Sequence, residues 1–92
     1  MSLWKSLFGS RSAKPAASAA PVEYNGFTIR PEPYLDDGQY QTAGVIEKEI
    51  AGVMKSHRFI RADRHPGFDD AVTFTIAKAK QIIDQQGDRL LP

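Results

Sequence analysis

Residues 22–29 read Val-Glu-Tyr-Asn-Gly-Phe-Thr-Ile and carry the clearest local structural signal in the chain. The dipeptide Asn25-Gly26 is typical of a two-residue type I′ turn, because both central residues of that turn need a positive φ. The residues on either side are β-branched or aromatic, as strands prefer. This stretch therefore predicts a β-hairpin in which Tyr24 faces Phe27 across the turn.

The residues that follow extend this hairpin into a larger sheet. Pro31 and Pro33 end the second strand or keep it at an edge, since proline donates no backbone hydrogen bond. Residues 36–38, Asp-Asp-Gly, predict a turn, and residues 39–50 and 53–63 read as a third and a fourth strand. The sequence His-Pro-Gly at residues 65–67 then ends the fourth strand.

The connection between the third and fourth strands leaves two registers open. A two-residue loop places Lys48 opposite Lys55, and like charges in that position oppose strand pairing. A three-residue loop with Gly52 in the left-handed conformation pairs Glu47 with Lys55 instead. We favour the three-residue loop because it avoids the repulsion.

Residues 69–86 predict one amphipathic helix. Asp69 and Asp70 lie at its N-terminus, where acids complement the helix dipole, and Gly87 follows as a helix-ending residue. Residues that recur at helical spacing form one face, made of Phe68, Val72, Thr75, Ile76, Ala79, Ile82 and Ile83. The whole pattern predicts an α+β fold, a four-stranded antiparallel β-meander with this C-terminal helix packed on one face.

Phe74 falls almost opposite the apolar face of the predicted helix, beside Ala77 and Gln81. An exposed aromatic side chain among small residues indicates a protein interface. The plainer interpretation is that a loop or the N-terminal segment covers half of the ring.

The N-terminal part has a different composition from the rest. Residues 9–21 lack any large apolar side chain, so they cannot bury enough surface to offset the entropy of ordering them. We expect residues 1–21 to form a flexible basic tail and residues 22–92 a single domain. A short amphipathic helix at residues 2–8 would anchor the chain to a membrane surface or a partner, although a frayed tail is the plainer expectation. Its apolar residues are Leu3, Trp4, Leu7 and Phe8.

The net charge of +1 divides unevenly along the chain. Residues 1–20 contain three basic residues and no acid, whereas the remainder contains nine basic and eleven acidic residues. A dedicated DNA-binding domain usually carries a clear positive excess on its folded surface, which this domain lacks. The domain also offers only one long helix, whereas a helix-turn-helix needs at least two.

No sequence pattern indicates catalysis, a metal or a cofactor. The absence of cysteine removes disulfides, thiolate nucleophiles and cysteine-based zinc sites. His57, Asp63 and His65 are suitable ligand types without a metal-binding spacing, and Ser56 and His57 point to opposite faces of a strand. We therefore expect a non-enzymatic protein without cofactor, metal or small-molecule substrate. Because no long apolar segment or signal-peptide pattern occurs, we expect a cytoplasmic location.

The most concentrated basic feature lies in the predicted fourth strand. Its members are Lys55, His57, Arg58, Arg61 and Arg64. As a functional feature, this segment would bind phosphate or carboxylate groups of DNA or of a partner protein. As a structural feature, it would pair with Glu47, Glu49 and other acids of the sheet. Arg58 and Arg61 point to opposite faces of a regular strand, so one continuous patch requires the strand to twist or end early.

The order of several segments resembles the bacterial HlyU family, whose members are named as transcriptional activators of haemolysin expression. The similar segments are residues 22–27 (VEYNGF), 30–33 (RPEP), 38–40 (GQY), 43–49 (AGVIEKE), 57–63 (HRFIRAD) and 79–90 (AKQIIDQQGDRL). The Leu-Phe-Gly at residues 7–9 and the Ala/Pro-rich stretch after it are also similar, so the resemblance covers essentially the whole chain. It implies a role in activating transcription, and none of its segments is a catalytic motif.

The resemblance leaves three routes of action open. In the first, the protein contacts DNA without a known DNA-binding motif, through Arg58, Arg61, Arg64 and the basic tail. In the second, it acts through a transcription-related protein, using the Phe74 face or an edge strand of the sheet. In the third, it is a small protein-interaction or membrane-surface adaptor held by residues 2–8. A homodimer would add stability to a core of this size.

Overall fold

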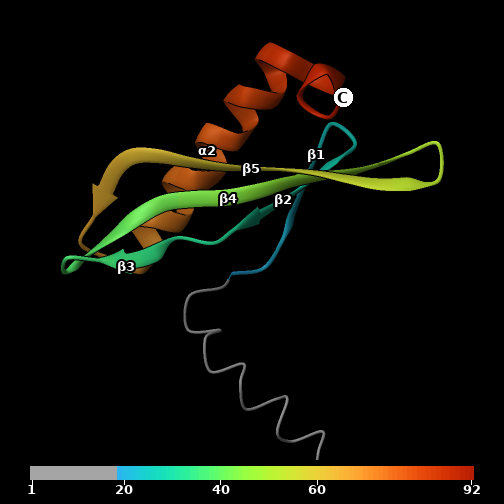
Figure 1. Cartoon of the computed structure of the whole chain (residues 1–92). Coiled ribbons are helices and arrows are strands. Elements are labelled where there is room, and N and C mark those ends of the chain that lie inside the picture. Colours follow the sequence, from blue (N-terminus) through green and yellow to red (C-terminus); the bar gives the residue numbers. More distant parts are fainter. Residues whose placement is uncertain (1–18) are drawn as a thin grey trace, which may run out of the picture.

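The computed structural model describes residues 19–92 and shows a β-sheet with one long helix across it (Figure 1). The elements are β1 (Val22–Tyr24), β2 (Phe27–Pro31), β3 (Tyr34–Asp36), β4 (Gln39–Ile50), β5 (Val53–His65), α2 (Phe68–Gln86) and the 3-10 helix η2 (Gly87–Leu90). The predictions for the tail, and for a helix at residues 2–8 with Leu3, Trp4, Leu7 and Phe8, fall on residues 1–18 and lie outside the described part.

Strand β4 is the centre of an antiparallel sheet and has neighbours on both sides. β2 and β3 pair with one side of it and β5 with the other, while β1 continues the sheet beyond β2. The predicted α+β class is confirmed. The antiparallel order of the four predicted strands is confirmed as well, since they pair in sequence as β1, β2, β4 and β5. The number of strands is corrected to five, because the described residues also form β3, which pairs with β4.

Two-residue turns connect the strands of the hairpins, as the dipeptides ending in glycine predict. Asn25 and Gly26 have φ values of 48° and 83°, which confirms the predicted type I′ geometry, and Tyr24 pairs with Phe27. The predicted turn at residues 36–38 is also present, with positive φ at Asp37 and Gly38. It joins β3, a short strand that the sequence did not predict, to β4.

The loop between β4 and β5 has two residues, so the three-residue loop was the wrong choice. Ala51 and Gly52 both have positive φ, and Lys48 pairs with Lys55. The like charges tolerate this register because each ammonium group contacts the C-terminal segment. Lys48 Nζ lies 2.9 Å from Asp88 Oδ1, and Lys55 Nζ donates to the carbonyl oxygen of Pro92 at 2.9 Å.

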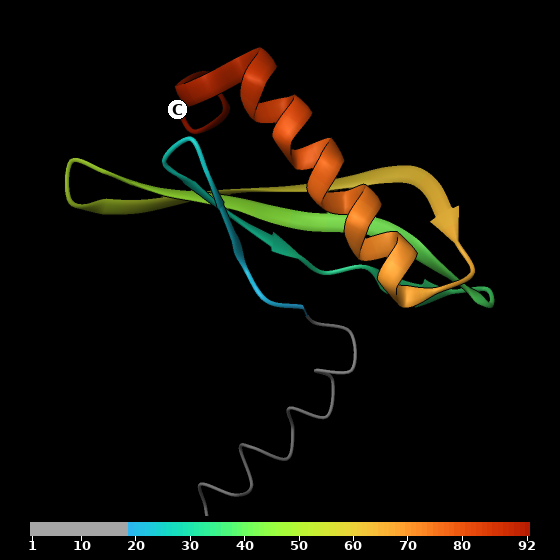
Figure 2. The same cartoon turned by 180° about the vertical axis from the view of Figure 1, so that it is seen from behind.

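Helix α2 covers one face of the sheet, as Figure 2 shows from behind, and the hydrophobic core lies between them. The buried core residues are Phe27, Ile29, Ile46, Phe59, Ala79, Ile82, Ile83, Leu90 and Leu91. The predicted apolar face of the helix is confirmed at Thr75, Ala79, Ile82 and Ile83, and Ala71 is buried as well. The contribution of Leu90 and Leu91, from η2 and the residue after it, was not predicted.

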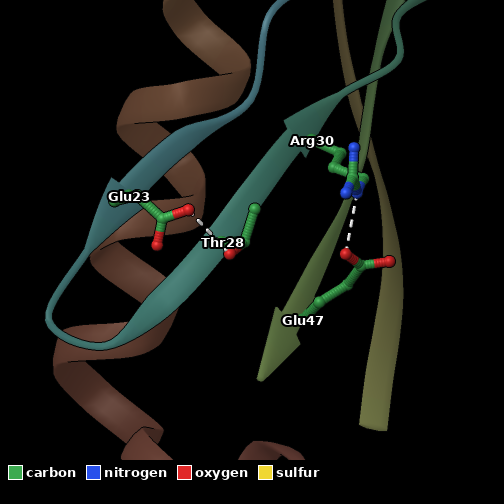
Figure 3. Close-up of polar contacts among 4 residues, drawn as sticks. All are labelled: Glu23, Thr28, Arg30 and Glu47. Atoms are coloured by element: carbon green, nitrogen blue, oxygen red, sulfur yellow. Dashed lines mark hydrogen bonds and ion pairs between the residues drawn. The ribbon is translucent and has the colours of Figure 1, made fainter. Parts of the chain in front are cut away.

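The opposite face of the sheet is covered by no other element of residues 19–92. Since successive side chains of a strand alternate between faces, the buried Ile29 and Ile46 place Arg30 and Glu47 on this open face. Figure 3 shows both side chains on the side of the sheet away from the helix ribbon. The open face therefore presents charged side chains to solvent.

Candidate functional site on strand β5

Strand β5 is the outer strand at one edge of the sheet. It pairs with β4 from Val53 to His65, and within residues 19–92 no second strand pairs with it. Of its thirteen residues only Phe59 is buried. The strand thus exposes both its outer backbone edge and most of its side chains.

Positive charge is concentrated on this strand. β5 contains four basic residues and one acid, a net charge of +3 with histidine neutral. The rest of residues 22–92 contains five basic and ten acidic residues, a net charge of −5. The near-neutral total therefore conceals a positive edge on an otherwise negative domain, and such a field attracts anionic groups to β5.

A break in the β4–β5 register positions the last arginines. Gln41 pairs with Arg64 and Ala43 with Ile60, so three residues of β5 lie opposite Thr42 alone. Extra residues of this kind bend a strand and increase its twist. In Figures 1 and 2 the end of β5 curls toward the start of α2. Here the strand departs from the regular alternation that separated Arg58 from Arg61.

Gln41 holds both ends of this break and was not identified from the sequence. Its side-chain oxygen Oε1 accepts a hydrogen bond from Arg64 Nε at 2.9 Å, and its amide Nε2 donates to the backbone carbonyl of Arg61. The residue itself is buried. No local pattern marks Gln41, because its role depends on which residues of β5 it faces.

The three arginines of β5 are held differently. Arg64 forms an ion pair with Asp36, with Nη2 2.9 Å from Oδ2. The Arg61 guanidinium carbon lies 5.9 Å from the centroid of the Phe59 ring. Arg58 is exposed and makes no ion pair or side-chain hydrogen bond with residues 19–92. Arg58 and Arg61 thus have no acidic partner among residues 19–92, and Arg58 is the one of the three that also makes no hydrogen bond or aromatic contact through its side chain.

The acids that were expected to neutralise β5 are engaged elsewhere or distant in register. Glu47 pairs with Arg30, with its Oε1 2.7 Å from Arg30 Nε, as Figure 3 shows. This hydrogen bond, and then the charge of the carboxylate, raises the pKa of Arg30 above its ordinary value. Glu49 lies opposite Met54 rather than beside Arg58. Neighbouring Thr28 donates to Glu23 at 3.0 Å on the same face.

The other candidate residues of β5 have structural contacts. Lys55 contacts Pro92, as described above, and His57 is half-buried opposite Ile46. His65 pairs with Tyr40 at the far end of the strand, so His57 and His65 are separated. Within residues 19–92 no three histidine, aspartate or glutamate side chains are grouped closely enough to hold a metal ion.

Of the two interpretations of Phe74, the structure shows the plainer one, a half-covered ring, although strand β5 contributes the cover. The ring of Phe74 is half-buried, with its centroid 4.8 Å from that of His65, and Lys78 Nζ lies 5.6 Å from it. The curled end of β5 covers it. Ala77 and Gln81 remain exposed, but the surface they form lacks the aromatic anchor that suggested an interface.

Comparison with known proteins gives one match. The model of a family described as transcriptional activator HlyU matches residues 2–91. No curated protein and no solved structure matches the chain. None of the helices in residues 19–92 has the length and apolar character of a membrane span.

Proposed function

Because the chain belongs to the HlyU family, a family of transcriptional activators, we propose that it raises transcription by presenting strand β5 to a protein partner. Transcriptional regulators are not a class of enzymes. The observation that supports the proposal best is the segregation of charge, which concentrates +3 on an edge strand that has no outer neighbour among the described residues. We expect a protein with this role to act in the cytoplasm.

Two features favour a protein partner over direct reading of DNA. Reading bases requires a helix or a β-ribbon that enters a groove. Helix α2 packs one face on the sheet and carries three acids and two lysines. The tip of the β4–β5 hairpin carries Glu47 and Glu49, and its two lysines contact the C-terminal segment. Neither element offers a basic surface shaped for a groove.

Direct contact with DNA phosphates is the second candidate, and the net charge of β5 favours it. Arg58, Arg61 and Arg64 would bind phosphates without reading sequence, together with the basic residues of the N-terminal segment. Binding of this kind weakens steeply with salt. The two candidates therefore differ in a measurable way.

The experiment is a comparison of transcript levels in a bacterium that lacks its own copy of the gene. Complementation with the original chain restores the affected transcripts, and Arg58→Glu fails to restore them. Lys78→Glu makes the same change of charge on α2 and serves as the matched control. Unchanged transcripts in the deletion strain would overturn the role in transcription. Full restoration by Arg58→Glu would overturn the role of β5.

Fluorescence anisotropy of labelled upstream duplex DNA separates the two candidates. We expect no tight binding at either about 50 or about 200 mM salt. Tight binding at the lower salt that collapses at the higher salt would favour phosphate contact in place of a protein partner.

A further inference from the structure

The outer edge of β5 has a row of backbone groups suited to pair with one more strand. The two-residue turn places Ile50 opposite Val53, and the directions of backbone groups alternate along an antiparallel pair. Met54, Ser56 and Arg58 therefore direct their N–H and C=O groups away from β4. None of the backbone hydrogen bonds outside the helices and strands of residues 19–92 involves these three residues.

The side chains along this edge combine one available charge with apolar surface. Met54 and Ile60 are 61% and 47% exposed, and both lie on the open face with Arg58 between them. A strand added beside β5 would thus meet a basic side chain flanked by apolar ones. Main-chain hydrogen bonds would supply affinity, and these side chains would select the segment.

Charge decides among the segments that such an edge can accept. A second copy that paired through the same strand would bring another β5, and two strands of +3 each repel when they lie side by side. The N-terminal twenty residues carry three basic residues and no acid, so they have the same sign. Basic side chains on an edge strand are a known protection against self-association. An acidic segment is the complementary occupant.

We propose that β5 binds an extended, acidic segment of a partner protein as an added sixth strand of the sheet. The inference rests on the proposed function and adds the mode of binding and the chemistry of the partner. The segment carries a carboxylate beside Arg58 and, two positions along the same face, an apolar residue beside Ile60. The carboxylate and the guanidinium form a charge-assisted pair at the sheet edge.

A synthetic peptide tests this mode directly. The probe is a fluorescein-labelled peptide of about eight residues with the core Val-Thr-Glu-Thr-Glu, a length in the ordinary range for strands. One control peptide carries methyl groups on alternate backbone nitrogens, which keeps the charge and prevents strand pairing. A second control replaces each glutamate by lysine. We expect the parent peptide to bind, the methylated peptide to bind about tenfold more weakly or worse, and the lysine peptide not to bind.

Variants of the full chain test the protein side. Ser56→Pro removes one outward N–H, and edge strands tolerate proline where that group faces solvent. Arg58→Glu reverses the available charge. Both weaken binding of the parent peptide, and circular dichroism confirms that each variant is folded. If Ser56→Pro does not fold, the methylated peptide still tests strand pairing. In the amide spectrum, exchange at Met54, Ser56 and Arg58 slows when the parent peptide binds.

The possible results separate the mode of binding from the function. Equal affinity for the parent and methylated peptides would overturn strand addition in favour of simple charge attraction. Binding of duplex DNA but not of the parent peptide would overturn the acidic segment. If the parent peptide does not bind while Arg58→Glu still abolishes transcript restoration, the proposed function is supported and the added strand is overturned. If the parent peptide binds with all the expected controls while deletion leaves transcripts unchanged, the added strand stands and the role in transcription falls.

Discussion

At the scale of single residues, Gly44 shows how tightly the helix and the sheet are fitted. A Cβ atom at this position would lie 3.0 Å from Thr75 Cγ2 on α2 and 3.0 Å from the carbonyl oxygen of Arg30 on β2. Such distances are too short without movement, and one of the two obstacles is backbone. Hydrogen is therefore the side chain that allows α2 to pack on β4 at this point.

We predict that Gly44→Ala destabilises the domain by about 1–3 kcal/mol, the usual cost of overpacking a close-packed core. Urea unfolding followed by circular dichroism measures the change. Gly67→Ala is the matched control, because its backbone is extended and its Cβ would make an ordinary contact of 3.5 Å with Asp70 Oδ2. The control changes stability by no more than about 0.5 kcal/mol. Equal effects of the two substitutions would contradict the close approach at Gly44.

Tyr24 links the first hairpin to the helix and gives a prediction about pH. Its hydroxyl donates to Asp84, 2.9 Å from Oδ1 and 3.1 Å from Oδ2. This bond first, and then burial and the charge of Asp84, raises the pKa of Tyr24 above its ordinary value of 10.0. The stabilising bond is present below the unfolded-state pKa and is lost as the pH rises through the raised folded-state pKa.

We predict that Tyr24→Phe removes part of the loss of stability seen above about pH 10. Urea unfolding at a series of pH values from about 8 to about 11 measures it, as the difference between variant and original chain. Tyr34→Phe is the control, because Tyr34 makes no side-chain hydrogen bond with residues 19–92, and it keeps the original pH profile. An unchanged profile in Tyr24→Phe would show that the bond to Asp84 contributes nothing in solution.

At the scale of elements, the position of β5 at the sheet edge predicts an alternating pattern of amide hydrogen exchange. The amides of Lys55, His57 and Phe59 point toward β4, whereas those of Met54, Ser56 and Arg58 point outward. We expect the first set to exchange at least about tenfold more slowly than the second, because only the first is hydrogen-bonded within the sheet.

Strand β4 supplies the internal control for that measurement. Residues 44–47 pair with β2 on one side and with β5 on the other, so successive amides are protected alike. Nuclear magnetic resonance follows both strands in the same sample. Equal protection of all β5 amides would mean that another part of the chain already covers the outer edge. The inference that this edge is free to pair would then be wrong.

The elements that the sequence predicted are those whose signals are local. The Asn25-Gly26 turn and the helix could be read from neighbouring residues, because turn geometry and helical spacing depend on little else. Strand β3 escaped because three residues after Pro33 have no pattern of their own, and only pairing with β4 makes them a strand. The register at Lys48 and Lys55 was misjudged because the groups that relieve the repulsion come from the C-terminus.

The candidate site could be predicted only in part, because some of its contacts join residues that are distant in the sequence. The basic content of β5 is visible in the sequence, and Arg58, Arg61 and Arg64 were identified there. Their partners Gln41 and Asp36 depend on the register break and on β3, so no reading of residues 53–65 alone could find them. The element that half-covers Phe74 could not be named from the sequence, because a helical wheel shows one helix and not the strand that curls over it.

At the scale of the whole molecule, the domain is small and its core is completed by the end of the chain. The described residues, 19–92, are of a number for which a single core supplies only about 3–5 kcal/mol of stability. Leu90 and Leu91 are 5% and 4% exposed and pack into a core that otherwise comes from β2, β4, β5 and α2. Lys48 and Lys55 also contact this terminal segment. The β4–β5 hairpin is thus tied to the last residues of the chain.

We predict that Leu91→Ala costs about 2–5 kcal/mol, as truncation of a buried leucine usually does, and so removes most of the stability of the domain. The measurement is urea unfolding, and Leu35→Ala is the control because Leu35 is 62% exposed and its loss costs no more than about 0.5 kcal/mol. Because the contacts of Lys48 and Lys55 with Asp88 and Pro92 depend on the packing of this segment, the like-charge pair regains its repulsion as the segment detaches. Peptide binding at β5 should therefore weaken together with stability in Leu91→Ala and persist in Leu35→Ala. A Leu91→Ala variant as stable as the original chain would show that the C-terminal segment does not complete the core, and the register of the hairpin would then need another explanation.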